Sequence, residues 1–119
     1  SLTGSSSATP TSTATSNTTY TLTVTAGNGC TDTDQATVTV NTSPTASNAG
    51  PNDSQCQAIG AYTLAGNTPS VGTGSWSQIS GPTSSITTPS SPTSGVTGMS
   101  TAGTYIYEWT ITNAPCTPS

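Results

Sequence analysis

The acidic side chains are the only charged groups of this chain, which makes them the first candidates for chemistry. The 119 residues contain no Lys, Arg or His, and the acids are Asp32, Asp34, Asp53 and Glu108. His is the most frequent general base, and protein zinc sites rely on Cys and His ligands. A nucleophile elbow of the form GxSxG is absent as well. The sequence therefore predicts a protein that is not an enzyme and has no cofactor.

Asp32 and Asp34 stand on alternate residues after a Gly-containing turn and are the candidate metal ligands. Calcium takes roughly six to eight oxygen ligands, so two carboxylates need a further acid that folding brings near. Asp53 and Glu108 are distant from them in sequence. The alternative is that Asp32 and Asp34 are solvated residues that blunt the beginning of an edge strand. On this basis we expect no metal site.

Asn, Ser and Thr are the other residues that could carry chemistry, as acceptors of glycans. The N-glycosylation sequon begins at three positions, Asn17, Asn41 and Asn52. Two runs rich in Ser, Thr and Pro, residues 5–16 and 83–94, favour O-glycosylation. Candidate acceptors in these runs are Ser12, Thr13, Thr87 and Thr88. The alternative for both runs is an unmodified polar linker or loop.

The net charge of -4, with no basic residue, limits the classes of partner. Nucleic acid binding requires Lys or Arg to neutralise phosphates, so DNA, RNA and anionic lipid heads are excluded as direct partners. No run approaches the roughly 18 apolar residues that cross a bilayer. The first residues, SLTGSSS, lack the basic and apolar regions of a signal peptide. We therefore expect a mature or internal segment without membrane insertion.

Alternation of apolar and polar residues predicts a β-hairpin in the first part of the chain. Residues 19–25 read TYTLTVT, which places Tyr20, Leu22 and Val24 on one face and threonines on the other. Residues 26–29 read AGNG, a turn sequence, and the alternation resumes over residues 35–41. These two segments are expected to pair.

A second group of strands is predicted between residues 61 and 112. Residues 104–112 read TYIYEWTIT and should form a central strand, with one face made of Tyr105, Tyr107, Trp109 and Ile111. Shorter candidates, separated by Gly, Pro and Ser, are residues 61–65, 74–79, 85–87 and 95–99. No stretch has a convincing helical period. The predicted fold class is all-β, built as thin β-sandwiches.

The two strongest strands belong to copies of a repeat. Tyr20 is followed by Cys30 ten positions later, and Tyr105 by Cys116 eleven positions later. We expect two domains, residues 1–41 as the C-terminal half of one repeat and residues 42–119 as a second repeat lacking its last strand. Residues 1–41 are too few to bury a core alone. They belong either to a longer tandem array or to a chain that exchanges strands with identical neighbours.

The odd number of cysteines leaves one sulfur without a partner in the chain. The repeat predicts a disulfide between Cys56 and Cys116, with Cys30 paired to a residue outside this sequence. Two alternatives remain open, in which Cys30 is a free thiol or pairs with one of the other two.

Several sequence motifs carry a family resemblance. Residues 11–40 include TTYTLTVT and GNGC, and residues 48–116 include GSWSQISGP and AGTYIYEWTI with a trailing Cys. These segments resemble the PKD-like and immunoglobulin-like repeats of giant secreted surface proteins of the Bacteroidota. The resemblance implies a seven-strand-type sandwich at the cell surface. It also implies that Trp76 is a core tryptophan and that Tyr20 and Tyr105 form tyrosine corners.

Three functions are compatible with this sequence. The first is a non-catalytic structural repeat of an extracellular surface protein or fibre, glycosylated and self-assembling with neighbouring repeats or identical subunits. The second is an adhesive or carbohydrate-binding module that presents rings of Tyr62, Trp76, Tyr107 or Trp109 to sugar, although strand parity favours core packing for the last two. The third is a filament in which strands such as residues 35–41 pair with another subunit.

Overall fold

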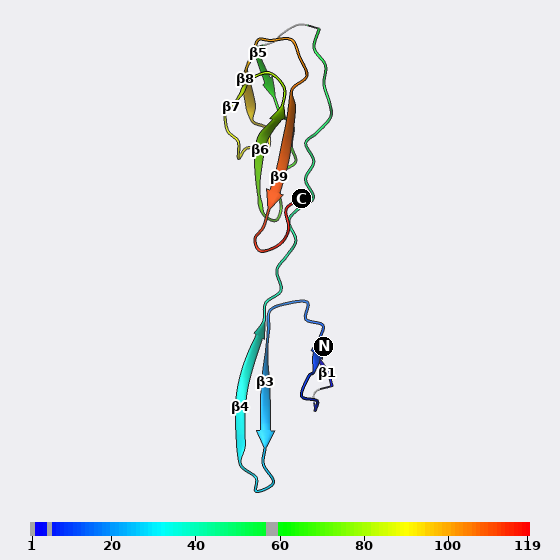
Figure 1. The fold of residues 1–119 in the computed structure, drawn as a ribbon, viewed down its shortest axis with the longest axis vertical. Coiled ribbons are helices and arrows are strands. Elements are labelled where there is room, and N and C mark those ends of the chain that lie inside the picture. Colours follow the sequence, from blue (N-terminus) through cyan, green and yellow to red (C-terminus); the bar gives the residue numbers. More distant parts are fainter. Residues whose placement is uncertain (1, 5, 57–59) are drawn as a thin grey trace. The chain divides into compact units, whose positions relative to one another are not determined.

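The computed structural model describes residues 2–4, 6–56 and 60–119 (Figure 1). Its contacts divide the chain into two compact units, Ser1–Asn41 and Thr42–Ser119. Every regular element in the described residues is a β-strand, and all strand pairs are antiparallel. The predicted all-β class is confirmed.

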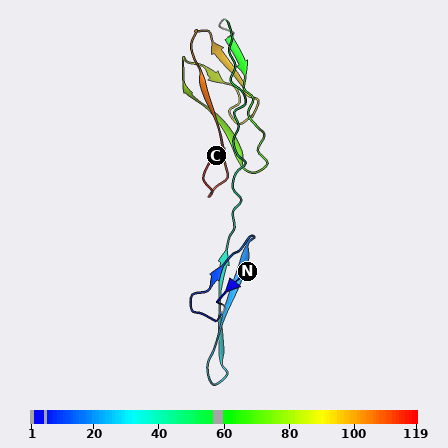
Figure 2. The same cartoon turned by 90° about the vertical axis from the view of Figure 1, so that its right-hand side faces the viewer.

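The first unit is dominated by a hairpin of β3 (Thr18–Thr25) and β4 (Thr31–Val38), seen as two long arrows in Figures 1 and 2. A smaller ladder joins β1 (Leu2–Thr3) to β2 (Thr11–Ser12). The turn is a tight loop, in which Gly29 takes the left-handed conformation with φ 86°. The N–H of Gly29 donates to Ala26 O at 2.8 Å, and the N–H of Ala26 donates to Cys30 O at 2.8 Å.

The second strand of this hairpin begins earlier than the sequence predicts. The alternation places it over residues 35–41, whereas β4 spans Thr31–Val38. The reason is the tight loop, which brings Thr31 directly opposite Thr25. The polar residues Asp32 and Asp34 are therefore strand residues, and they do not belong to the turn.

The second unit contains two antiparallel sheets. One has the order β5–β8–β7, formed by Gly60–Thr63, Gly95–Met99 and Ser85–Ile86. The other pairs β6 (Thr73–Ser80) with β9 (Ile106–Thr112). Each segment predicted as a strand in this part of the chain overlaps one of these strands, with ends that differ by at most two residues. Glycine, proline and serine residues are frequent in the connections between them, as the sequence indicates.

The core of the second unit lies between these two sheets. Its fully or nearly buried apolar side chains are Leu64, Trp76, Val96, Trp109 and Ile111. Trp76 and Trp109 are directly opposite in the β6–β9 register, and their ring centroids are 5.1 Å apart. The alternation predicted for β9 is confirmed, because Trp109 and Ile111 are 3% and 0% exposed while the outward residue Ile106 on the same strand is 48% exposed.

Two glycines make room for the tryptophan pair. A Cβ added at Gly74 would overlap carbon atoms of the Trp109 six-membered ring, and one at Gly66 would lie 2.9 Å from Cζ2 of Trp76. Neither glycine has a positive φ. Their role is therefore steric, since the large rings lie where side chains of neighbouring residues would otherwise be.

The two tyrosines expected in tyrosine corners behave differently. The Tyr105 hydroxyl donates to Thr101 O at 2.8 Å, which is the expected bond to nearby backbone. The Tyr20 hydroxyl instead bonds to the side chain of Ser12. Both rings are only half-buried. The expectation that Tyr20 and Tyr105 are core residues is wrong, because neither is buried, and the Tyr20 hydroxyl bonds a side chain of β2 and not the backbone.

Candidate functional site

The acidic residues do not converge on a metal site. Asp32 and Asp34 lie on β4 and are exposed. Each carboxylate accepts the N–H of the next residue, at 2.9 Å from Thr33 and 2.8 Å from Gln35. No group of three or more His, Cys, Asp or Glu in residues 2–4, 6–56 and 60–119 could hold a metal ion.

These two bonds lie along the outer edge of the hairpin. Ala26 and Cys30 are joined by a backbone hydrogen bond across the turn, and bonded pairs alternate with non-bonded pairs along an antiparallel ladder. The backbone groups of Asp32 and Asp34 therefore point toward β3, while those of Thr33 and Gln35 point away from it. The carboxylates cover the N–H groups that another strand would need. Asp32 and Asp34 thus protect this edge from pairing, as natural proteins do with charged edge residues.

We predict that the double substitution D32A/D34A allows the outer edge of β4 to pair with a strand of another molecule. Two N–H groups become available, and a net hydrogen bond contributes about 0.5 to 1.5 kcal/mol. Thioflavin T binding, which reports stacked strands, should appear at an about tenfold lower protein concentration than for the unmodified chain.

The matched control is D53A/E108A, which removes the same amount of charge without freeing an N–H on a strand. Asp53 bonds the N–H of Ser54 in a coil segment, and Ser54 is not part of a strand. If both double variants bind thioflavin T alike, net charge governs association and the edge bonds do not.

The predicted Cys56–Cys116 disulfide is wrong for this structure, because Cys30, Cys56 and Cys116 are all free thiols. Cys56 lines the same cavity as Tyr105, which precedes β9. Cys116 follows the other end of β9, where its Sγ donates to Thr42 O at 3.4 Å. A strand of seven residues spans about 20 Å, whereas disulfide-bonded Cα atoms lie about 4.4 to 6.8 Å apart. The pairing of Cys30 outside this sequence stays a prediction.

The candidate N-glycosylation residues Asn17, Asn41 and Asn52 are all exposed. Asn17 also has a structural role, since its Oδ1 accepts the N–H of Val40 at 2.9 Å and extends the hairpin beyond Val38. A glycan on its amide nitrogen would leave this oxygen in place. All three positions remain candidates.

The candidate O-glycosylation residues Ser12, Thr13, Thr87 and Thr88 are exposed as well. The Ser12 hydroxyl bonds to Tyr20, and that of Thr87 donates to Gly95 O at 3.0 Å. The backbone N–H of Thr88 donates to Ser94 Oγ at 3.0 Å. The segment around Thr87 and Thr88 is thus an ordered loop rather than an extended linker.

The aromatic rings divide between the core and a cavity of about 730 Å³, whose lining includes Tyr62, Trp76, Tyr105 and Tyr107. Trp76 and Trp109 are buried, and their indole N–H groups donate to Pro92 O at 3.1 Å and Asn67 O at 3.2 Å. Tyr107 and Tyr62 are half-buried and pack against the core, with the Tyr107 hydroxyl 2.7 Å from Ser84 Oγ. Core packing is therefore the role of both tryptophans.

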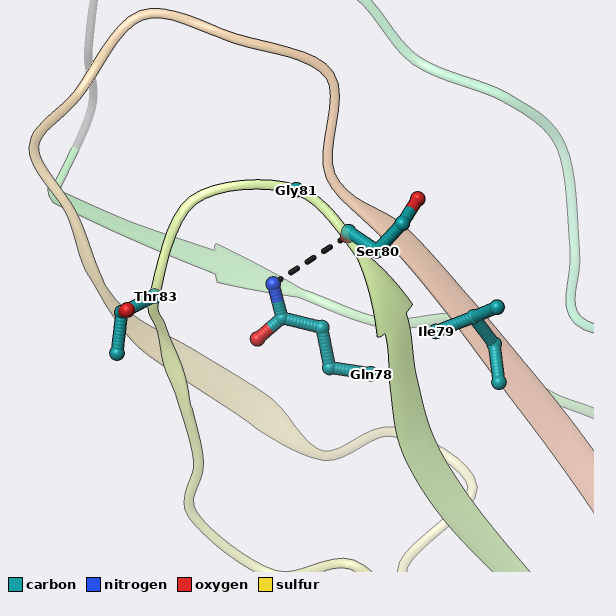
Figure 3. Close-up of a pocket in the computed structure, with 5 residues that line it drawn as sticks. All are labelled: Gln78, Ile79, Ser80, Gly81 and Thr83. Carbon is teal, nitrogen blue, oxygen red and sulfur yellow. Dashed lines mark hydrogen bonds between the residues drawn. The ribbon is translucent and has the colours of Figure 1, made fainter.

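A shallow hollow of about 260 Å³ lies at the turn after β6 (Figure 3). Its lining residues are Gln78, Ile79, Ser80, Gly81 and Thr83. The Gln78 amide donates to Ser80 O at 3.3 Å, the dashed line in Figure 3, and to Pro82 O at 2.7 Å. Its Oε1 accepts from Ser84 Oγ at 2.8 Å. Gln78 therefore fixes the turn, and its polar atoms are already engaged.

The sequence alone indicates only some of the residues on the two faces of the β3–β4 hairpin. On one face, β3 threonines lie opposite β4 residues, with the register Thr19–Thr37, Thr21–Gln35, Thr23–Thr33 and Thr25–Thr31. The other face carries the exposed apolar residues Leu22, Val24 and Val38, with Asp34 opposite Leu22 and Asp32 opposite Val24. The alternation in residues 31–37, TDTDQAT, is the signal for the threonines of the second strand.

Comparison with family models, with curated proteins and with solved structures finds no match to this chain. In the part of the chain that the structure describes, there is also no helix of the length and apolarity needed to span a membrane.

Proposed function

We propose that this chain is a non-catalytic structural repeat of an extracellular bacterial surface protein or fibre, which assembles through β-sheet surfaces and carries glycans. Its two units are immunoglobulin-like or PKD-like, the first of them incomplete. The observation that carries the proposal is the exposed apolar face of the β3–β4 hairpin.

The face of the hairpin that carries Tyr20, Leu22 and Val24 on β3 carries Ala36 and Val38 on β4, together with Asp34 opposite Leu22 and Asp32 opposite Val24. Leu22 and Val24 are 59% and 58% exposed. The related face of β9 in the second unit is covered by a sheet, and its residues Trp109 and Ile111 are buried. A hairpin of two strands is at best marginally stable in water without a covered face. The exposed apolar side chains of this face favour contact with another molecule, provided that the carboxylates of Asp32 and Asp34 beside them stay solvated or hydrogen-bonded.

The remaining surface fits a passive, extracellular role. Exposed Thr and Ser residues cover the strands outside the core, and the four acids are scattered. Without Lys or Arg the chain offers trypsin no cleavage site, which suits a polymer exposed to proteases. Low charge limits solubility, and glycans on exposed Ser, Thr or Asn residues would offset this.

The experiment is sedimentation velocity of the chain and of L22T/V24T. Thr keeps the preference for strands but removes most of the apolar area. Burial of a Leu or Val side chain is worth about 1.5 to 3 kcal/mol, and 1.4 kcal/mol is a tenfold change in Kd. We expect the double variant to weaken assembly at least about tenfold.

The matched control is I79T, which removes a side chain that is 55% exposed in the second unit. It should assemble as the unmodified chain does. Equal assembly of L22T/V24T and the unmodified chain would contradict the role of the hairpin face.

A further inference from the structure

The turn between β3 and β4 contains a pair of residues that can react with each other, Asn28 and Gly29. A backbone nitrogen can attack the side-chain amide carbon of the Asn before it, unless a side chain on its own residue hinders the approach. Gly has no side chain, and even a Cβ added at Gly29 would meet no atom within 4 Å. The other Asn residues precede larger ones, with Thr after Asn17, Asn41 and Asn67, Ala after Asn48 and Asn113, and Asp after Asn52.

The Asn28 side chain is folded back over the turn. Its Oδ1 accepts the N–H of Cys30 at 3.2 Å, which is the hydrogen bond of an Asx turn. The ring closed by this bond includes Asn28 Cγ and Gly29 N, so the two atoms that would react are held near each other. The donor on Oδ1 also draws electron density from Cγ and makes this carbon more open to attack.

The same turn restrains the attacking nitrogen. The Gly29 N–H donates to Ala26 O at 2.8 Å, and the Ala26 N–H donates to Cys30 O at 2.8 Å. Gly29 N can attack only after its proton has left, so the bond to Ala26 O must first break. One such bond changes an equilibrium by about two- to tenfold. The closed turn therefore slows the reaction and does not prevent it.

We propose that Asn28 is a self-modification site, at which the chain loses ammonia and takes up water at a rate set by the hairpin turn. Gly29 N gives up its proton and forms a bond to Asn28 Cγ. The bond from Cγ to Nδ2 breaks, and Nδ2 takes up a proton and leaves as ammonia. The product is a succinimide ring. Water then adds to either ring carbonyl and breaks its bond to Gly29 N, which takes back a proton, and leaves aspartate or isoaspartate.

Formation of isoaspartate would open the turn. The main chain then runs through Cβ and Cγ of residue 28, so the loop is longer by one methylene group. The modification also adds one negative charge to the net charge of -4. The lengthened loop no longer places the Gly29 N–H against Ala26 O, and the turn loses the bonds that close it. The reaction is thus a one-way change in the hairpin.

The test is ageing of the full chain at mildly alkaline pH, in buffer and in concentrated urea. Cleavage before Asp residues then releases residues 1–31, which contain Asn17 and Asn28. Mass spectrometry of this fragment measures the conversion of each amide to a carboxyl group. We expect Asn28 to convert while Asn17 stays largely intact. Conversion of Asn28 should be about two- to tenfold faster in urea, because the Gly29 N–H is released from Ala26 O.

G29A separates access to the nitrogen from the effect of the turn. In urea no turn remains, so the added methyl group alone should slow the conversion of Asn28. Conversion of Asn28 no faster than that of Asn17, a rate in buffer equal to or above that in urea, or an equal rate for G29A in urea overturns the inference.

N28D is the matched control for the opening of the turn. It gains the same charge and keeps the Oδ1 acceptor, but its main chain is not lengthened. Hydrogen exchange measured by NMR should show that the Ala26 and Gly29 amides lose protection in the isoaspartate form and keep it in N28D. Equal protection in the two forms would contradict the opening of the turn by the longer main chain.

Discussion

Replacing Gly74 by Ala should strongly destabilise the second unit, although the substitution adds only one methyl group. The added Cβ would overlap the Trp109 ring, which is itself held between Gly74, Gly66 and Trp76. A buried ring of this size has no free space to move into, and overpacking costs about 1 to 3 kcal/mol, occasionally more. We expect the urea midpoint, followed by tryptophan fluorescence, to fall by roughly 1 M, because m-values of small proteins are about 1 to 3 kcal/mol/M.

The control for G74A is G27A. A Cβ at Gly27 meets no atom within 4 Å, and its φ is not positive. Because Gly27 lies in the first unit, G27A should leave the unfolding transition of the second unit unchanged. A double-mutant cycle with W109F sharpens the test, since Phe lacks the outer ring atoms that the methyl group meets. The loss of stability caused by G74A should be smaller in a chain that also carries W109F. An equal loss in both backgrounds would contradict the overlap of the added methyl group with the Trp109 ring.

The second large effect is expected for W109A. Trp109 is 3% exposed, lies beside Trp76 and donates its indole N–H to Asn67 O. Truncation of a buried tryptophan costs about 3 to 5 kcal/mol, which is comparable to the whole stability of a small domain. We expect urea unfolding of the second unit, read by Trp76 fluorescence, to lose its cooperative transition.

I106A serves as the control on the same strand. Ile106 is 48% exposed and faces away from the core. Its removal should lower stability by less than about 1 kcal/mol, as is usual for exposed positions. If I106A and W109A destabilise the second unit equally, the assignment of inner and outer faces of β9 is wrong.

The alternation of side chains is sufficient to predict most strands and the core face of β9. Trp109 and Ile111 are buried and Ile106 is exposed, as the period of two residues requires. The alternation involves only residues close together in the chain, so it can be recognised from the sequence alone. The packing of Trp109 against Gly74 depends on register between two strands far apart in sequence, which no local pattern specifies.

The candidate site residues show where local patterns cease to be informative. Asp32 and Asp34 are acidic residues of an edge strand, one of the two roles that the sequence allows, but their bonds to Thr33 and Gln35 depend on the turn that sets the hairpin register. The Cys56–Cys116 pairing is wrong because a repeat gives sequence spacing and does not give distance. The pairing of Ile111 with Ser119 beside β9 is shown only by the three-dimensional structure.

The central claim is that this chain assembles through its sheet surfaces, and sedimentation velocity of the unmodified chain over a wide concentration range tests it most directly. The account predicts species larger than the 11.7 kDa chain, whose proportion rises with concentration and falls when Leu22 and Val24 are replaced by Thr. A single species of monomer mass at every concentration would contradict it.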